Sequence, residues 1–331
     1  MRLLVVLLLV ANSFVWATST IHPKATIVIN NRTGKVIYNY NADIQTQPAS
    51  LTKMMTLLLT FKALRQKRIS LKTRLTVSHH AANQRPCKLG LIPGSTITVK
   101  DAILALITKS ANDVAIALAE LVGGNEKSFV FMMNREAKKL GMKSTIFMNP
   151  SGWKNPRQLS TARDLAKLSR ALIREYPHYY HFFSTRQFKY KGIVHKNHNK
   201  LLGYHGNILI DGIKTGYVAA SGYNIAVSAK LKKNHLIIVV LGGTNSKDRD
   251  SQVLVLAQKG FVRLKHVASF SKGSKKSEIK APEKPAELKS GQNNITLEQS
   301  EKILKAYQMH IRNKKFKKGD TNEKCQINQA G

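Results

Sequence analysis

The sequence predicts an α/β fold in which a helical subdomain is inserted between two sheet-forming regions. In the first region, β-rich runs at residues 25–30 and 35–40 flank the turn cluster Asn31-Arg32-Thr33-Gly34 and predict a hairpin. Apolar residues at helical spacing follow in four segments, at residues 101–106, 113–121, 125–140 and 161–175. The second sheet-forming region comes after these helices, so the helices form an insert within an α/β domain.

The second sheet-forming region is built from long apolar runs. Residues 223–229 and 236–241 are joined by the basic turn 230–234, which predicts an antiparallel hairpin. Residues 251–264 predict a closing amphipathic helix that packs on the sheet. Further extended or alternating runs predict strands at residues 71–77, 96–99, 184–194 and 208–216.

The charge of the chain is strongly positive. Its 331 residues can form one large domain or two small ones, and 54 Lys and Arg stand against 18 Asp and Glu, a net charge of +36. Residues 265–331 contain only 15 of the basic and 7 of the acidic residues, so the part before them is basic too. The electric field of such a positive charge concentrates anionic partners. The candidate partners are nucleic acid, an anionic membrane surface and an anionic cell-wall polymer.

The first residues indicate export. Met1-Arg2 is a short positive start, residues 3–10 are continuously apolar, and Val15-Trp16-Ala17 fits a small-residue cleavage site. This pattern predicts a signal peptide over residues 1–17, the alternatives being an uncleaved anchor or a buried first strand. Export disfavours nucleic acid as a partner and predicts a periplasmic or cell-envelope protein, with peripheral membrane attachment as one option.

The last part of the chain differs in composition. Residues 266–331 are basic, and up to residue 294 they are dominated by Ser, Lys, Gly, Pro and Glu, which predicts disorder. Residues 297–318 are compatible with a basic amphipathic helix, either solvated or lying on a membrane surface. The two cysteines, Cys87 and Cys325, can pair, but the polar surroundings of the second disfavour a bridge. No Cys/His cluster has structural-zinc spacing.

Candidate catalytic residues lie at Ser50 and Lys53. On the first turn of a helix, residues three apart share one face. A serine hydroxyl needs a base within hydrogen-bond reach, and a lysine amine serves if burial or a nearby cation keeps it neutral. The following helix is apolar nearly all round, which predicts burial and a rigidly held serine (Met54, Met55, Leu57, Leu58, Leu59 and Phe61).

Two later motifs distinguish Ser50 from other serines. Ser-x-x-Lys also occurs at Ser269/Lys272 and Ser277/Lys280, where an N-cap serine with a solvated lysine is the simpler interpretation. Only Ser50/Lys53 is followed by Ser110-Ala111-Asn112 and Lys214-Thr215-Gly216. Ser-x-x-Lys, Ser-x-Asn and Lys-Thr-Gly, in that order and widely separated, form the motif set of the penicillin-recognising serine enzymes.

With these motifs, the chain resembles the low-molecular-mass penicillin-binding proteins, which are D-alanyl-D-alanine carboxypeptidases of the cell envelope. The likeness covers roughly residues 23–265 and extends to the runs Met133-Asn134, Phe147-Met148-Asn149-Pro150-Ser151-Gly152, Ser160-Thr161-Ala162-Arg163-Asp164 and Asp211-Gly212-Ile213. It implies a β-lactamase/transpeptidase-like fold, with an antiparallel sheet flanked by helices plus a helical subdomain. It also implies a catalytic domain over residues 18–265, followed by the tail 266–331.

The resemblance also implies roles for individual residues. Ser50 would attack the carbonyl of the penultimate D-alanine, Lys53 would take its proton, and Ser110 would relay a proton to the leaving amine. The backbone N–H groups of Ser50 and Tyr217 would form the oxyanion hole. The implied substrate-binding residues are Asn112, Lys214, Thr215, Gly216, Tyr217 and Arg249. The implied ligands are peptidoglycan pentapeptides and β-lactam antibiotics, without a metal or cofactor.

Some features depart from that family or leave alternatives open. Val218 stands where members often carry threonine, and the tail is too short and polar for the β-sandwich of larger members. A class A β-lactamase would need a glutamate that activates the deacylating water, and none is evident near Asn149–Gly152.

The motifs do not distinguish a carboxypeptidase from a D,D-endopeptidase that cuts peptidoglycan cross-links. A non-catalytic envelope-binding protein is disfavoured by the intact motifs, and a nucleic-acid binder lacks an aromatic-interleaved basic motif.

Overall fold

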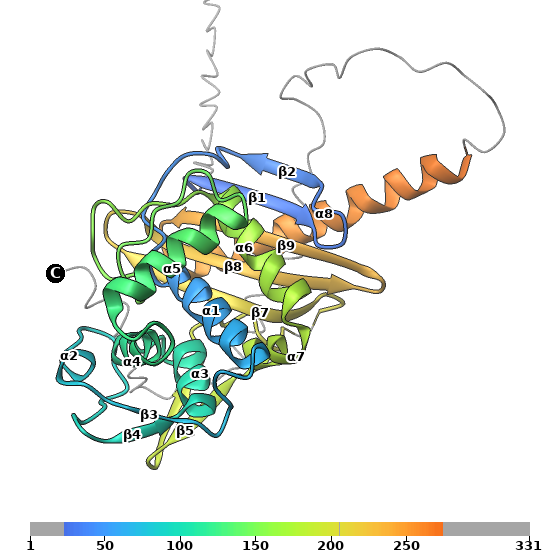
Figure 1. Ribbon diagram of the computed structural model, residues 1–331. Coiled ribbons are helices and arrows are strands. Elements are labelled where there is room, and N and C mark those ends of the chain that lie inside the picture. Colours follow the sequence, from blue (N-terminus) through green and yellow to red (C-terminus); the bar gives the residue numbers. More distant parts are fainter. Residues whose placement is uncertain (1–22, 205, 274–331) are drawn as a thin grey trace, which may run out of the picture.

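The computed structural model describes residues 23–204 and 206–273, and an antiparallel sheet lies at its centre (Figure 1). The sheet has the strand order β2-β1-β9-β8-β7. Its strands are β1 (Ala25–Asn30), β2 (Val36–Tyr40), β7 (Leu209–Val218), β8 (Gly222–Leu231) and β9 (Asn234–Gly243). Because β1 pairs with β9, the hairpin at the start of the described chain completes a sheet whose other strands come after the helices. The predicted α/β fold with an antiparallel sheet is confirmed.

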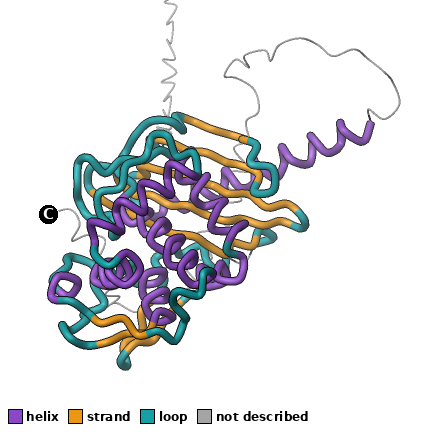
Figure 2. Tube along the Cα trace, viewed as in Figure 1, coloured by secondary structure: helices purple, strands orange, loops and turns teal. Residues whose placement is uncertain are grey.

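Helices cover both faces of this sheet (Figure 2). The helical elements are η1 (Ala49–Thr52), α1 (Lys53–Arg65), α2 (His79–Ala82), α3 (Val99–Thr108), α4 (Asn112–Gly123), α5 (Glu126–Lys139), α6 (Ala162–Glu175), α7 (Pro177–Tyr180), η2 (His181–Ser184) and α8 (Ser246–Gly273). Two small two-stranded antiparallel sheets complete the described fold, one from β3 (Arg74–Thr76) and β4 (Thr96–Thr98) and one from β5 (Gln187–Tyr190) and β6 (Ile193–Lys196).

The two faces of the sheet belong to two separate hydrophobic cores. Along β9, Ile237, Val239 and Leu241 pack in the core that holds α1 and α6, whereas Leu236, Ile238 and Val240 pack in the core of α8. Successive side chains of a strand point to opposite faces, so burial on both faces requires a continuous apolar run. This requirement explains the unbroken hydrophobic sequence of β9.

Helix α1 lies where the helical subdomain meets the sheet domain. It contacts α4 and α5 on the subdomain side and α6 on the sheet side. All its residues except Lys62 and Arg65 are buried. The predicted buried helix after Ser50 is therefore confirmed, and its N-terminal end is held from both domains.

Several predicted boundaries were wrong. The single strand predicted over 184–194 is a 3₁₀ turn followed by the β5–β6 hairpin, because Lys191 and Gly192 adopt positive φ angles of 44° and 82° that suit a tight turn. The closing helix α8 begins earlier than predicted, with Asn245 Oδ1 accepting the Asp248 N–H at 2.8 Å near its start. It also continues to Gly273, beyond residue 264, where the predicted helix ended.

Some predictions fall outside the described residues. These are the signal peptide at 1–17, the tail from residue 274 onward, the amphipathic helix at 297–318, and Cys325 as a partner for Cys87. Cys87 itself is 2% exposed. Over the described ranges, no helix combines the length and apolar character needed to cross a membrane.

A half-buried histidine links the sheet to the β1–β2 turn. Nδ1 of His235 lies 3.0 Å from Asn31 Nδ2, and its Nε2 lies 2.7 Å from Ser228 Oγ. Burial, and to a lesser degree the positive charge of Lys230, lowers the pKa of His235 to about 4. The folded protein therefore holds this imidazole neutral at pH values where an unfolded chain would protonate it.

We predict that His235 makes the folded state sensitive to acid. Its pKa is about 4 when folded and about 6.5 when unfolded, so the unfolded state binds more protons between these values. As pH falls from 6.5 to 4, the free energy of unfolding should drop by about 2 kcal/mol through this group. Urea unfolding at pH 7 and pH 4.5 should show a smaller drop in His235→Asn, but not in the exposed-site control His79→Asn. Equal drops in all three proteins would contradict the assignment.

Candidate active site

Ser50 and Lys53 lie one turn apart at the start of the buried helix. Ser50 is in the 3₁₀ turn η1, and Lys53 is the first residue of α1. Lys53 Nζ lies 3.1 Å from Ser50 Oγ, and Lys53 and Ser50 are 0% and 5% exposed. The predicted nucleophile and base are thus within hydrogen-bond reach in a site largely shielded from water.

The amine of Lys53 has three oxygen neighbours. Besides Ser50 Oγ, Nζ donates to Asn112 Oδ1 at 2.7 Å and to the carbonyl oxygen of Ser151 at 2.5 Å. A neutral amine has two N–H bonds and one lone pair. Because the Asn112 and Ser151 oxygens can only accept, they take the two N–H bonds and leave the lone pair for the Ser50 hydroxyl.

The electrostatics of the site favour this neutral amine. Burial lowers the pKa of Lys53 well below its ordinary value, and the nearby charge of Lys214 lowers it further, with a smaller opposing effect from Asp113. No carboxylate within the described ranges forms an ion pair with Lys53. The geometry therefore lets Lys53 accept the proton of Ser50.

Asn112 ties α4 to the Lys53 amine. Its Oδ1 accepts from Lys53, its Nδ2 donates to the carbonyl of Arg85 at 2.9 Å, and its backbone N–H donates to the carbonyl of Cys87. The family resemblance assigned Asn112 to substrate binding. In this structure both ends of its amide hold protein groups, so it positions Lys53, and the substrate contact stays a prediction.

Ser110 lies in the short link between α3 and α4. It is 3% exposed and has a left-handed backbone with φ of 62°, which is unusual for a residue with a side chain. Its Oγ is buried and has no hydrogen-bond partner within the described residues. The structure therefore presents an unpaired hydroxyl on a strained backbone, a combination that is frequent at functional sites.

Strand β7 brings the Lys-Thr-Gly motif against Ser50. A Cβ atom on Gly216 would lie 3.0 Å from the Ser50 nitrogen and 3.1 Å from the Pro48 oxygen, which is tighter than most Cβ contacts, so glycine favours this close approach. The next residue, Tyr217, packs its ring on Tyr223 with centroids 4.5 Å apart, and Val218 is 4% exposed. The backbone of residues 216–217 thus lies beside Ser50. The family resemblance implies an oxyanion hole here, formed by the backbone N–H groups of Ser50 and Tyr217.

Lys214 and Arg249 form a buried cationic pair beside this strand. They are 2% and 1% exposed, and Lys214 Nζ donates to the Thr215 carbonyl at 3.0 Å. Burial and the charge of Arg249 lower the pKa of Lys214 to about 7. Arg249 donates to Asp250 Oδ1 through Nε at 2.8 Å and Nη2 at 2.7 Å.

Two polar atoms in this cationic region lack partners. Arg249 Nη1 and Thr215 Oγ1 are buried and make no hydrogen bond to any described residue. Leaving a buried polar group unpaired costs about 1–3 kcal/mol, and more for a charged group. An anionic ligand with two oxygens, such as a carboxylate, would satisfy both atoms.

The turn Asn149–Gly152 contributes to the site in a way that the sequence did not predict. The Ser151 carbonyl accepts from Lys53, and the Pro150 carbonyl accepts from Thr56 Oγ1 at 2.7 Å. A Cβ atom on Gly152, whose φ is +81°, would lie 2.0 Å from the Ala49 oxygen. No sequence signal distinguished this contact, because α1 also buries Thr60, whose Oγ1 donates within the helix to the Thr56 carbonyl at 2.8 Å.

The fold and this site define the class of the penicillin-binding proteins. Among solved structures, penicillin-binding protein 6B of Escherichia coli resembles the chain with a TM-score of 0.68 and 35% identity, over 73% of this chain and 76% of that one. Penicillin-binding protein D2 of Listeria monocytogenes, solved in an ampicillin-bound form, resembles it with a TM-score of 0.62 and 31% identity, over 72% of this chain and 97% of that one.

Sequence comparison identifies the family. Residues 12–245 match the D-alanyl-D-alanine carboxypeptidase family, and the chain belongs to it. The D-alanyl-D-alanine carboxypeptidase DacC of Escherichia coli is 38% identical over 248 residues, covering 73% of this chain. The chain spans 62% of the length of that relative.

We predict that Gly152→Ala disrupts the Ser50 turn. The new methyl group would collide with the Ala49 oxygen, so the free energy of unfolding should fall by about 3 kcal/mol. Gly141→Ala is a matched control, because Gly141 also has a positive φ of 68° but a Cβ atom there would meet nothing within 4 Å. The control should lose only about 1 kcal/mol from backbone strain. Equal losses in urea unfolding would show that the close approach to Ala49 has no energetic weight.

Proposed function

We propose that the chain is a serine-type D-alanyl-D-alanine carboxypeptidase that removes the terminal D-alanine from peptidoglycan pentapeptides. Penicillins would acylate the same serine. The proposal is carried by one observation: Lys53 Nζ lies 3.1 Å from Ser50 Oγ while its two N–H bonds are taken by Asn112 and Ser151. Membership of the D-alanyl-D-alanine carboxypeptidase family supports it.

In the acylation step, Ser50 Oγ attacks the carbonyl carbon of the penultimate D-alanine as Lys53 takes the hydroxyl proton. The oxyanion that forms is stabilised by the backbone N–H groups of Ser50 and Tyr217. Collapse of this intermediate breaks the C–N bond, leaving an ester on Ser50. The departing D-alanine amine receives a proton through Ser110.

In the deacylation step, water attacks the Ser50 ester while Lys53 again accepts a proton. The ester C–O bond breaks, and the proton returns to Ser50 Oγ. The products are the shortened peptide with a new carboxylate and the regenerated enzyme. No metal or cofactor enters this scheme.

The cationic region of Lys214, Thr215 and Arg249 would bind the terminal carboxylate of the substrate. The unpaired Arg249 Nη1 and Thr215 Oγ1 supply two donors, and Lys214 supplies charge. Carboxylate recognition requires a free terminal residue, which agrees with a carboxypeptidase. The other proposed substrate contacts come from Asn112, Gly216 and Tyr217.

We further propose an envelope location for the protein. The predicted signal peptide at residues 1–17 would direct it out of the cytoplasm, with residues 18–265 as the catalytic domain and 266–331 as a basic tail. The net charge of +36 would hold it against an anionic surface or polymer of the envelope.

We predict covalent reaction at Ser50. Intact mass after penicillin treatment should rise by one acyl adduct in the wild type and should not change in Ser50→Ala. Ser151→Ala is a control serine next to Lys53, and it should keep the adduct because Lys53 contacts only the carbonyl of this residue. An adduct that persists in Ser50→Ala would place the nucleophile elsewhere.

We predict different defects when the two active-site lysines are replaced by arginine. Lys53→Arg should slow acylation by roughly 10³-fold, because a guanidinium does not deprotonate in this pH range and cannot act as a base. Lys214→Arg should keep part of the activity, because charge is the main contribution of this residue. Stopped-flow acylation rates measure both, and a wild-type rate in Lys53→Arg would reject the proposed base.

The pH profile gives an internal check on Lys214. With a pKa of about 7, Lys214 is charged below pH 7 and loses its charge as pH rises through that value. Wild-type kcat/KM for a carboxylate-terminated peptide should therefore decline above pH 7. Arginine stays charged, so Lys214→Arg should remove this decline, and an unchanged alkaline limb in the variant would contradict the assigned role.

A further inference from the structure

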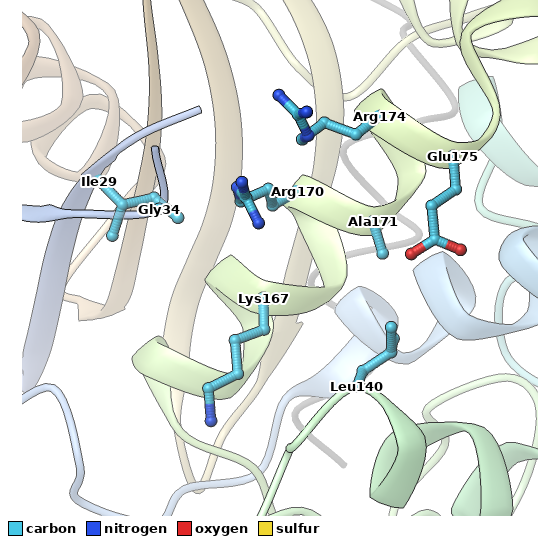
Figure 3. Close-up of a pocket in the computed structure, with 8 residues that line it drawn as sticks. All are labelled: Ile29, Gly34, Leu140, Lys167, Arg170, Ala171, Arg174 and Glu175. Carbon is cyan, nitrogen blue, oxygen red and sulfur yellow. The ribbon is translucent and has the colours of Figure 1, made fainter. Parts of the chain in front are cut away.

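A cavity of about 300 Å³ opens beside α6 (Figure 3). Its lining comes from β1, the β1–β2 turn, the C-terminal end of α5 and α6, through Ile29, Gly34, Leu140, Lys167, Arg170, Ala171, Arg174 and Glu175. None of these residues belongs to the Ser50 site. Arg65, at the C-terminal end of α1, donates to the Glu175 carbonyl at 3.2 Å. Since α1 has 13 residues, its Arg65 end, which contacts Glu175, lies roughly 20 Å from Ser50.

Three cations line one side of this cavity. Lys167, Arg170 and Arg174 are three and four residues apart, so they share one face of α6, as Figure 3 shows. Lys167 is already paired with Asp164 Oδ1 at 2.8 Å. The two arginines have no carboxylate partner within the described ranges, so they provide the uncompensated charge of the cavity.

Arg170 is held in place by the β1–β2 turn. Its Nε donates to the Asn31 carbonyl and its Nη2 to the Arg32 carbonyl, both at 2.9 Å. Its Nη1 forms no hydrogen bond to any described residue. Arg174 makes one long contact, 3.4 Å to the Arg32 carbonyl. The guanidinium of Arg170 is therefore preorganised, and both arginines keep donors for a ligand.

The other walls restrict the chemistry of that ligand. Ile29, Leu140 and Ala171 are apolar, and Glu175 adds one carboxylate at the C-terminal end of α6. A carboxylate there is disfavoured by the helix dipole and opposes an anion in the cavity. The cavity therefore suits a short aliphatic peptide with carboxylates that meet the arginines. A flat anionic membrane would instead engage protruding residues.

We propose that this cavity is a second, non-catalytic binding site for stem peptides of the wall polymer. The identity of the polymer rests on the proposed function. Carboxylates of an uncleaved stem peptide bind Arg170 and Arg174, while aliphatic side chains lie on Ile29, Leu140 and Ala171. A polymer that carries many stem peptides can occupy this site and the Ser50 site together, which raises the effective substrate concentration at Ser50.

Co-sedimentation of the full chain with purified peptidoglycan tests this site. Arg174→Glu should weaken binding about tenfold at low salt, whereas Lys72→Glu, the same charge change at an exposed lysine before β3, should weaken it less than about twofold. Arg174→Gln should weaken it about threefold, and Glu175→Gln should strengthen it about twofold. Turnover of a small soluble pentapeptide should be unchanged in all four variants.

Two outcomes would overturn the second site. One is an equal loss of peptidoglycan binding in Arg174→Glu and Lys72→Glu, which would leave only the overall charge as the cause of binding. The other is dependence on Arg174 with anionic phospholipid vesicles but not with peptidoglycan, which would make the ligand a lipid. Failure of the proposed function is a separate result, because it would appear as no pentapeptide turnover in the wild type.

Discussion

The site depends on the burial of one lysine amine, that of Lys53, which has no carboxylate partner among the residues that the structure describes. A charged ammonium at 0% exposure would be strongly destabilising, so burial favours the neutral amine, which is the form that the proposed role as a base requires. Its two N–H bonds still need acceptors, and Asn112 and the Ser151 carbonyl supply them. What remains is a lone pair directed at Ser50. Structural stability and chemical activation thus require the same hydrogen bonds.

The surrounding elements follow from that requirement. Helix α4 presents Asn112, and Asp113 beside it accepts the N–H groups of Leu89, Gly90 and Leu91, which secures the adjoining loop. The turn Asn149–Gly152 presents the Ser151 carbonyl and is itself anchored through Thr56 of α1. Strand β7 closes the other side, where Gly216 allows its backbone to approach Ser50. Three segments distant in sequence thus converge on the first turn of α1, and the helical subdomain and the sheet domain both contribute to the site.

Charge acts on two scales in this molecule. Within the site, burial lowers the pKa of both lysines, and the charge of Arg249 lowers that of Lys214 further as the charge of Lys214 lowers that of Lys53, so buried basic groups act on one another over short distances. On the surface, the excess of basic residues is screened over about 8 Å at physiological salt, so it acts only where cations gather. The cavity of α6 is such a place, because Arg170 and Arg174 have no carboxylate partner within the described ranges. In the proposed scheme, the overall charge brings anionic partners near the protein, and local geometry decides where they bind.

The sequence by itself determined the fold class and the residues at the centre of the site. The hairpin at its start, the buried helix after Ser50 and the apolar strands β8 and β9 are local patterns, and the motif set of Ser50, Ser110 and Lys214 is readable from residue order. Tertiary structure alone decided which groups meet. Neither the Ser151 carbonyl nor the partners of Asn112 follow from spacing, because backbone carbonyls look alike in sequence and their contacts form across 98 and 27 residues. The extent of burial around Lys53 is likewise a property of the packed molecule, and that burial is what would let an ordinary lysine act as the proposed base.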